Sequence, residues 1–418
     1  MEECRYIELF AGVGGFHVGF DRAGKGFYKC ALANQWEPGA RDQFAANIYR
    51  MRFPDDTLIN HDVCSISGKD LEADIMVGGF PCQDYSVARN KSKSMGIEGK
   101  KGVLWWQVIR LLSEMKEKPK FLLFENVDRM LISPAKQRGR DFSLIIQSLV
   151  NLGYNIEWRV INAAEYGMPQ RRRRIFIFAF LKGEFKVFSP DSWLYRDGVL
   201  AKAFPVKPNV DQGLWGLDGR RLNTDLVYLS DNFNKGNVVS NPFENGGVVI
   251  DGLVYTDKLE VDYSGPYTTL GDIIVNGDDR KYITDDYYLS KEEIEKWKYA
   301  KGPKQIPRTS KDGHEYMYTE GAMSFPDPLD KPARTLITSE VSIVSNRFTH
   351  VIQDPETGKF RRLVPLELER IQMFPDNHTE GTTDKKRGFL MGNALVCGIV
   401  ERIGKELKRR IDETDHIG

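Results

Sequence analysis

The chain has 418 residues, of which 41% are hydrophobic and 28% are charged, a composition that excludes a disordered or fibrous protein and predicts two globular domains. Lys plus Arg and Asp plus Glu both number 59, so the formal net charge is zero and no basic excess covers the whole surface. Any nucleic-acid site must therefore be a local basic surface, with acidic residues elsewhere to balance it.

Short apolar runs alternate with amphipathic stretches between residues 5 and 181. We expect strands at Tyr6–Phe10, Cys30–Asn34, Ile75–Val77, Phe121–Phe124, Asn155–Val160 and Ile175–Phe180. Helices are expected between the strands, most clearly at Val103–Lys116 and Phe142–Leu152. Because strands and helices alternate and the strands are apolar throughout, the predicted fold class is α/β, with a mostly parallel sheet that binds ligands at the carboxyl ends of its strands.

The composition changes after about residue 185, where Gly, Asn, Asp, Pro and Tyr become frequent. Here we expect β-like runs at Gly247–Ile250 and Asp272–Asn276 and a helix at Lys291–Lys298. Near the C-terminus one apolar helix stripe returns, formed by Leu395, Ile399, Ile403 and Leu407. The predicted organisation is a first domain at 1–190, a smaller, irregular, β-leaning domain at 191–363, a hinge at 364–392 and a C-terminal helix at 393–418 that returns to the first domain.

The five cysteines, Cys4, Cys30, Cys64, Cys82 and Cys397, are scattered and form no C-x-x-C pair. We therefore expect neither a disulfide framework nor a metal site. No basic-then-apolar leader opens the chain, and no apolar run approaches the ~18 residues that span a bilayer. The sequence predicts a cytoplasmic protein without a membrane partner.

A glycine-rich turn at residues 8–15 (ELFAGVGG) follows the first expected strand. Its glycines let the backbone turn tightly near a ligand, and the next helix offers free N–H groups. A nicotinamide dinucleotide site needs a third glycine where this chain has His17, so the turn favours a nucleoside without a pyrophosphate. Gln35 and Trp36 are candidates to accept from ribose hydroxyls and to pack on adenine, and Asp62 can reach an adenine amino group. Taken singly, each of these features is also compatible with a purely structural role.

The sharpest local feature is residues 78–83 (GGFPCQ), which end an apolar strand. Pro81 fixes the backbone before Cys82, and a basic Gly- and Ser-rich stretch follows at 86–102. A cysteine in this position is typical of a nucleophile beneath a phosphate-binding segment. The alternative is a buried structural cysteine, the interpretation that we accept for the other four.

Two further blocks supply candidate partners for this cysteine. Residues 124–127 (FENV) place Glu125 after an apolar run, where burial would raise its pKa and let it donate a proton. Residues 169–174 (PQRRRR) precede a strand, and alternate residues of an extended chain face one way, so Arg172 and Arg174 can point together into a site. Alone, such an arginine run indicates a solvated or phosphate-binding surface.

Together these blocks resemble the cytosine-C5 DNA methyltransferase family. The matching blocks are FAGVGG at 10–15, NQWE at 34–37, GFPCQ at 79–83, FENV at 124–127, QRRRR at 170–174, PART at 332–335 and GNAL at 392–395. They span nearly the whole chain except residues 185–330, where the family places its variable target-recognition region. The resemblance implies a compact, monomeric restriction–modification enzyme with a Rossmann-like S-adenosylmethionine (SAM) fold. It also implies double-stranded DNA as substrate and, where a nuclease accompanies the enzyme, a restriction endonuclease that acts on the same site without a stable complex.

The resemblance also implies roles for individual residues. Cys82 attacks C6 of a flipped-out cytosine, Glu125 hydrogen-bonds the base, Arg172 and Arg174 hold it, and SAM methylates C5 and becomes S-adenosylhomocysteine. The positions that match the SAM pocket are Phe10, Gly12, Gly14, Gly15, Gln35, Trp36, Asp62, Val63, Pro81, Leu104, Asn393 and Leu395. Those expected near the base are Phe80, Ser86, Asn126 and Val127. Gln35 departs from the glutamate that the family commonly has there, and Ala394 replaces a common hydroxyl residue, a change expected to be tolerated.

Two alternatives stay open at this stage. A tRNA cytosine-5 methyltransferase has the same core, although the long insert between QRRRR and PART favours DNA readout. A non-catalytic DNA-binding relative would not need Cys82, Glu125 and the arginines together. The target sequence is not predicted, because it depends on which side chains of 185–345 reach base edges.

Overall fold

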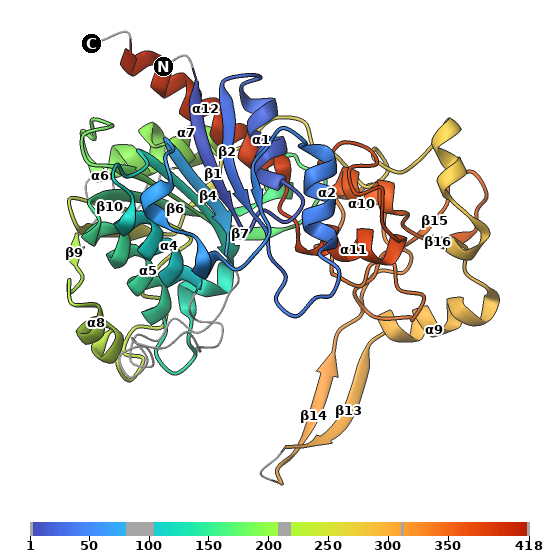
Figure 1. The fold of residues 1–418 in the computed structure, drawn as a ribbon. Coiled ribbons are helices and arrows are strands. Elements are labelled where there is room, and N and C mark those ends of the chain that lie inside the picture. Colours follow the sequence, from blue (N-terminus) through green and yellow to red (C-terminus); the bar gives the residue numbers. More distant parts are fainter. Residues whose placement is uncertain (1–2, 81–103, 208–218, 311–312, 416–418) are drawn as a thin grey trace. The chain divides into compact units, whose positions relative to one another are not determined.

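The computed structural model describes residues 3–80, 104–207, 219–310 and 313–415 (Figure 1). The chain forms two compact units. The first unit comprises Met1–Tyr166, Arg173–Gly265 and Cys397–Gly418, and the second comprises Gly167–Arg172 and Pro266–Val396. Residues 191–265, which the sequence assigned to the irregular domain, therefore pack with the first unit. The assignment of 191–363 to target recognition stays a prediction.

A ten-stranded sheet forms the centre of the first unit, in the order β3-β2-β1-β4-β5-β7-β6-β10-β11-β9. Its strands are β1 (Cys4–Leu9), β2 (Tyr28–Asn34), β3 (Leu58–Ile59), β4 (Ile75–Gly79), β5 (Phe121–Val127), β6 (Tyr154–Asn162), β7 (Arg173–Leu181), β9 (Arg220–Arg221), β10 (Gly246–Ile250) and β11 (Leu253–Asp257). Pairings from β3 to β5 are parallel, and those from β5 to β9 are antiparallel. The apolar runs expected to be strands all form strands of this sheet, and the α/β prediction is confirmed.

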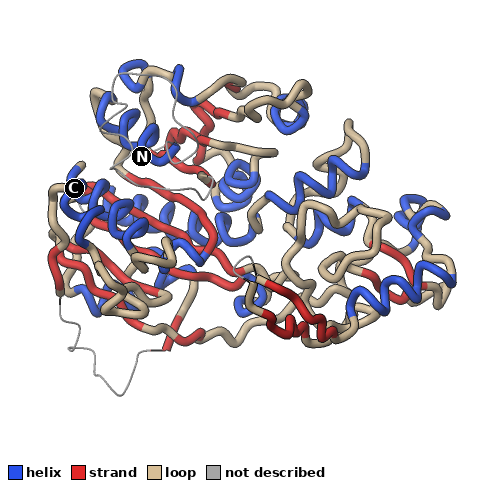
Figure 2. The backbone as a smooth tube through the Cα atoms, turned by 90° about the horizontal axis from the view of Figure 1, so that it is seen from below, coloured by secondary structure: helices blue, strands red, loops and turns tan. Residues whose placement is uncertain are grey.

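Helices lie beside the strands of this sheet (Figure 2). Those of the first unit are α1 (Gly15–Ala23), α2 (Phe44–Arg52), α4 (Leu104–Glu114), α5 (Arg140–Asn151), α6 (Pro190–Ser192), α7 (Val199–Ala203), α8 (Leu226–Asn232) and α12 (Cys397–Asp415), and a small separate sheet pairs β8 (Val206–Lys207) with β12 (Glu260–Val261). Successive side chains of a strand face opposite sides of a sheet. In β6, Ile156 and Trp158 accordingly join the apolar core with α4 and α5, whereas the Glu157 carboxylate accepts from the N–H groups of Leu200 and Ala201 in α7. The sheet is thus covered on both faces.

Helix α12 packs against α1 within the first unit. A Cβ at Gly19 would lie 2.5 Å from the Val400 side chain, so the glycine permits the two helices to approach closely. The Tyr28 hydroxyl donates to the carbonyl oxygen of Gly404 at 2.6 Å. Ile399, Ile403 and Leu407 of the expected apolar stripe lie on α12 and are buried, whereas Leu395 precedes this helix and belongs to the second unit. Among the described residues, no helix combines the length and apolar character that a membrane span requires.

The second unit contains helices α9 (Lys291–Lys301), α10 (Pro365–Ile371) and α11 (Asp384–Asn393) and the strand pairs β13 (Lys304–Thr309) with β14 (Glu315–Glu320) and β15 (Val351–Gln353) with β16 (Phe360–Arg362). A buried ion network connects β16 to α10, because Arg361 pairs with Asp354 at 2.8 Å and with Glu367 at 2.7 Å. The prediction of a β-like run at Asp272–Asn276 is wrong. The first residues of this run form a turn, the Val275 N–H donates to Glu367, and the Val275 side chain packs with Val364 and Leu366 instead of joining a sheet.

Candidate active site

Three of the sequence blocks, at residues 8–15, 78–83 and 124–127, lie at the carboxyl ends of the neighbouring parallel strands β1, β4 and β5. Leu9 of β1 pairs with Gly78 of β4, and Gly79 pairs with Glu125 of β5. The carboxyl ends of parallel strands meet at one edge of a sheet, where ligands of open α/β sheets bind. The glycine turn after β1, the strand end that precedes Cys82 in the chain, and Glu125 therefore share one edge of the sheet.

Glu125 and Arg174 form an ion pair at this edge. Arg174 Nε lies 3.0 Å from Glu125 Oε1, and the two side chains are 19% and 14% exposed. They come from β5 and β7, whose antiparallel register sets Val127 opposite Arg174. The expectation from the sequence considered burial of Glu125 alone. The neighbouring guanidinium is a partner that this expectation did not include, and the ion pair fixes the direction of the carboxylate.

Gly79 lies directly against the Glu125 carboxylate. A Cβ at Gly79 would be 3.3 Å from Glu125 Oε2, a tight contact that the side chain must relieve by moving. We expect Gly79→Ala to lower kcat by about tenfold or more, since small displacements of a catalytic group have large effects on rate. Steady-state methylation kinetics measure this effect. Gly321→Ala is the control, because a Cβ there meets no atom within 4 Å, and an unchanged kcat for Gly79→Ala would contradict the prediction.

Asn126 connects the ends of β4 and β5. Its Nδ2 donates to the carbonyl oxygen of Phe80 at 2.7 Å, and its Oδ1 accepts from the Val127 N–H at 2.8 Å. The Phe80 ring is buried against Trp105, with 4.9 Å between ring centroids. These contacts hold the segment that leads to Cys82. Contact of Phe80, Asn126 or Val127 with a base stays a prediction.

The glycine turn combines strained backbone with open space. Phe10, Gly12 and Gly14 have φ of 57°, 57° and 84°, and a positive φ is uncommon for a side chain as bulky as phenylalanine. A Cβ at Gly12 would meet nothing within 4 Å, whereas a Cβ at Gly14 would lie 2.3 Å from the Phe53 ring. Gly14 therefore permits close packing, Gly12 leaves room for a ligand, and α1 begins directly afterwards at Gly15.

Gln35 supports this turn from the end of β2. Its Oε1 accepts from the Gly12 N–H at 2.8 Å, and the side chain is almost fully buried. The sequence had assigned this carbonyl to ribose hydroxyls. Asn60, which no sequence motif indicated, donates to the backbone carbonyl oxygen of Gln35 at 2.6 Å, and Trp36 is 39% exposed. The end of β2 thus holds the glycine turn and leaves an aromatic side chain accessible.

The remaining cofactor candidates are placed as follows. Asp62 accepts from the Cys64 N–H at 2.9 Å and begins the short 3-10 helix Val63–Ser65, in which Val63 is buried. Leu104 begins α4 and packs on the core. Asn393 is the last residue of α11 and, like Leu395, belongs to the second unit. Whether these residues contact a cofactor stays a prediction.

The other expected site residues lie outside the described residues or in the second unit. Pro81, Cys82 and Ser86 lie outside the described residues. Arg172 belongs to the second unit, is buried, and donates from Nη2 to the carbonyl oxygen of Gly392 at 3.2 Å. The expectation that Arg172 and Arg174 point into one site stays a prediction.

A polar cluster between β1 and α1 was not predicted from the sequence. His17 Nδ1 lies 3.1 Å from Asp56 and its Nε2 lies 3.3 Å from Asp21, while burial raises the pKa of the neighbouring Glu8 to about 8. Burial lowers the pKa of His17, but the bonds to Asp21 and Asp56 outweigh it and raise this pKa to about 12. His17, Cys30 and Asp56 also place possible metal-ligand atoms within 4.8 Å of one another. Both ring nitrogens of His17 already lie close to carboxylates, and we propose no metal there.

The His17 cluster predicts a pH-dependent stability. The folded pKa of about 12 exceeds the ordinary 6.5, so the stabilisation is complete below pH 6.5 and is lost as the pH rises toward 12. The difference in free energy of unfolding between wild type and His17→Gln should shrink by roughly 1 kcal/mol per pH unit from pH 7 to 9. Urea denaturation at several pH values measures it, and a difference independent of pH would refute the role of this ion pair.

The profile of the C-5 cytosine-specific DNA methylase family matches residues 4–409. The Type II methyltransferase M.Sau3AI of Staphylococcus aureus is 45% identical over 417 residues, which cover 98% of this chain and 96% of that protein. The Type II methyltransferase M.BanI of Aneurinibacillus aneurinilyticus is 28% identical over 438 residues, with coverage of 97% and 96%.

Solved structures with the same fold include the Entamoeba histolytica methyltransferase EhMeth, with a TM-score of 0.58, 16% identity and 99% of each chain covered. The Dnmt2 methyltransferase of S. pombe gives a TM-score of 0.59 at 15% identity, with 99% of this chain and 100% of that chain covered. At such identities the likeness establishes the fold alone. The family profile and the Staphylococcus relative, each matched over nearly the full length, establish more: the chain belongs to the C-5 cytosine-specific DNA methylase family and is a cytosine-C5 DNA methyltransferase of the restriction–modification type.

Proposed function

We propose that this enzyme uses SAM to methylate C5 of a cytosine flipped out of double-stranded DNA, through a transient covalent bond to Cys82. The register of β1, β4 and β5 carries the proposal, because it gathers the glycine turn, the strand end before Cys82 and Glu125 at one sheet edge. Flipping is required because C6 of a stacked base is out of reach of a protein side chain.

SAM fits the chemistry of the glycine turn. The open space above Gly12 lets a ligand approach the backbone, and the N-terminus of α1 at Gly15 provides N–H groups. The accessible Trp36 ring offers an apolar face for adenine. His17 stands at the position where a dinucleotide site has its third glycine, and its imidazole pairs with Asp21 and Asp56. Bound SAM supplies an electrophilic methyl group.

Gln35 should limit the affinity for SAM. A carboxylate at this position can keep the bond to the Gly12 N–H with one oxygen and offer the other, as a charged acceptor, to a ribose hydroxyl. We expect Gln35→Glu to tighten SAM binding by about 1 kcal/mol, roughly fivefold in Kd. Isothermal titration calorimetry measures the change, and weaker binding by the glutamate variant would rule the explanation out.

Residues of the chain carry out the other steps of the proposed reaction. The Cys82 thiolate forms a bond to C6, and a thiolate is suited to this step because it both attacks and leaves readily. As the thiolate adds to C6, a ring electron pair moves toward N3, and N3 takes up a proton that comes from solvent through Glu125. Glu125, held by Arg174, also accepts from the amino group of the base, and N3 returns its proton when the thiolate leaves. After C5 is methylated, it loses its proton to a base, the C6–sulfur bond breaks, and aromaticity returns.

The substrate class is tested by one labelling assay. Radiolabelled SAM is incubated separately with duplex DNA and with tRNA, and label is expected in DNA alone. Label in tRNA but not in DNA would select the tRNA enzyme, and label in neither would indicate a binding protein.

We also propose that the enzyme acts as a monomer and that any cognate restriction endonuclease recognises the same site without a stable complex.

A further inference from the structure

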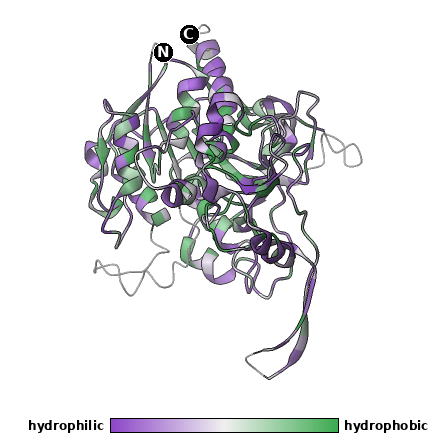
Figure 3. Cartoon of the chain, turned by 90° about the vertical axis from the view of Figure 1, so that its right-hand side faces the viewer, coloured by the Kyte–Doolittle hydropathy of each residue, from purple (hydrophilic) through white to green (hydrophobic). Residues whose placement is uncertain are grey.

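The β13–β14 hairpin is a separate two-stranded sheet. Within the described ranges of the chain its strands pair with each other alone, from Lys304–Glu320 at the root to Thr309–Glu315 near the turn, and the hairpin extends away from the rest of the second unit (Figures 1 and 3). Tyr316 and Met317 are 44% and 56% exposed. A lone two-stranded ribbon is only marginally stable in water, and exposed aromatic and methionine side chains on it indicate a binding surface.

One face of the hairpin presents an ordered arginine. Residues directly opposite in an antiparallel pair share a face, so Arg308 and Tyr316 lie on the same side as Ile306 and Tyr318. The Arg308 guanidinium lies 3.8 Å from the centroid of the Tyr318 ring. Within the described parts of the chain, no carboxylate forms an ion pair with Arg308. The Tyr318 ring therefore positions the guanidinium, whose N–H donors remain available for a ligand.

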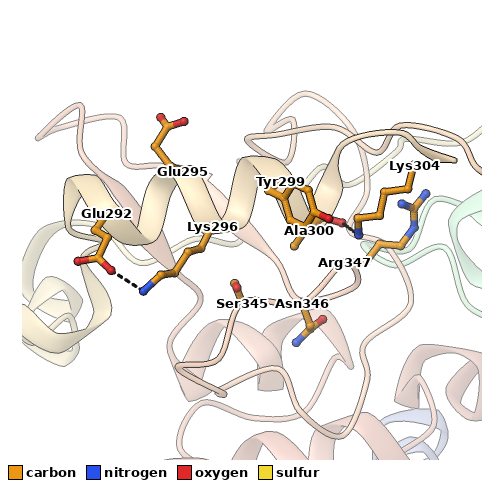
Figure 4. Close-up of a pocket in the computed structure, with 9 residues that line it drawn as sticks. All are labelled: Glu292, Glu295, Lys296, Tyr299, Ala300, Lys304, Ser345, Asn346 and Arg347. Carbon is orange, nitrogen blue, oxygen red and sulfur yellow. Dashed lines mark hydrogen bonds and ion pairs between the residues drawn. The ribbon is translucent and has the colours of Figure 1, made fainter. Parts of the chain in front are cut away.

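Unlike Arg308, the cationic side chains at the root of the hairpin pair with carboxylates. There, α9 and residues 345–347 line a hollow of about 610 Å³ (Figure 4). Lys304 and Arg347 both pair with Glu320, at 3.5 and 3.1 Å. On the wall of the hollow, Lys296 pairs with Glu292 at 2.6 Å. These pairs leave little net charge at the root, so the outer half of the hairpin is the better candidate for recognition.

We propose that the β13–β14 hairpin enters the major groove of the target DNA and that Arg308 reads a guanine there. The inference rests on the proposed function, since duplex DNA is the substrate. A B-DNA major groove, about 12 Å wide and 8.5 Å deep, admits a two-stranded ribbon. Six residues per strand extend about 20 Å, long enough to reach the groove floor. Arginine bonded to O6 and N7 of guanine is the commonest specific contact in such grooves.

The other face of the hairpin also suits a groove. Gln305, Thr309 and Thr319 lie on it together with Pro307, Met317 and Glu315, so this face offers amide, hydroxyl and carboxylate groups that can hydrogen-bond beside two apolar side chains. A ribbon inserted between two phosphate backbones is surrounded by polar groups, so hydrogen-bonding side chains are needed on both faces. A protein partner would instead favour one continuous apolar face.

The test is selection of bound duplexes from a randomised pool, followed by sequencing, with wild type, Arg308→Ala and Arg308→Lys. Wild type should enrich one motif, and Arg308→Ala should lose the preference for a single G·C pair by roughly 5- to 150-fold while the other positions persist. Arg308→Lys keeps the charge without the fork and should lose most of that preference. Lys359→Ala is the matched control, because Lys359 also lies over a tyrosine ring, 5.4 Å from the centroid of Tyr288, but outside the hairpin.

Three results would overturn the inference: the same motif with Arg308→Ala, an equal loss of preference at every position, or no motif with wild type. Replacing the critical guanine by 7-deazaguanine adds a second readout. It should weaken binding by wild type and leave Arg308→Ala unaffected, because the N7 acceptor is then already unused. Selection requires no methyl transfer, so an inactive enzyme that still reads this base through Arg308 would contradict the proposed function and support this inference.

Discussion

Replacing Cys82 with alanine is expected to reduce methyl transfer by at least ~10⁴-fold, the scale seen when a catalytic nucleophile is removed. Without the thiolate, nothing adds to C6, and C5 of an intact cytosine ring is a poor acceptor for a methyl group. Binding of duplex DNA should persist, because the alanine removes only a sulfur. Single-turnover transfer of labelled methyl, together with gel retardation of the same duplex, measures both properties.

Cys4→Ala is the matched control for this variant. Cys4 is a buried, free cysteine at the start of β1, and burial raises the pKa of its thiol well above its usual value. It therefore has no thiolate to contribute, and its removal should leave the transfer rate close to that of wild type. A Cys82→Ala enzyme that transfers methyl groups near the wild-type rate would eliminate the covalent mechanism.

Glu125→Gln is expected to lower the single-turnover rate by about 10²–10³-fold, the range for loss of one preorganised electrostatic partner. The amide keeps the shape of the side chain but loses the charge that pairs with Arg174 and with a proton at N3 of the base. Since the change acts on the chemical step, Kd for SAM should hardly move.

Glu165→Gln provides the comparison, because Glu165 is an exposed carboxylate of the same unit. A rate for Glu125→Gln within a few-fold of the Glu165→Gln rate would show that Glu125 is not required for the reaction. The two rates are best compared at saturating SAM and DNA, where differences in binding no longer contribute.

Local patterns were sufficient to predict the core of the fold. Apolar runs such as Phe121–Phe124 form strands because they can be buried on both faces of a sheet. The antiparallel extension of the sheet by β10 could not be predicted. It depends on pairing between Val248 and Glu157, residues far apart in the chain, and no periodicity in either segment encodes that register.

The same limit applies to the candidate site. Glu125, Arg174 and Gln35 were identified as candidates from motifs, but their partners were not. The ion pair of Glu125 with Arg174 follows from the register of β5 with β7, and the bond of Gln35 to Gly12 joins the ends of β2 and β1. Motifs therefore indicate which residues take part, whereas their interactions depend on contacts that only the folded chain creates.

A duplex that carries 5-fluorocytosine in the target site tests the covalent mechanism most directly. Fluorine at C5 cannot be lost as a proton is, so the C6–sulfur bond should persist after methyl transfer. In the presence of SAM we predict a denaturation-resistant protein–DNA species whose digest, analysed by mass spectrometry, carries the modified nucleotide on Cys82. Absence of that species, or attachment to any other residue, would contradict the mechanism.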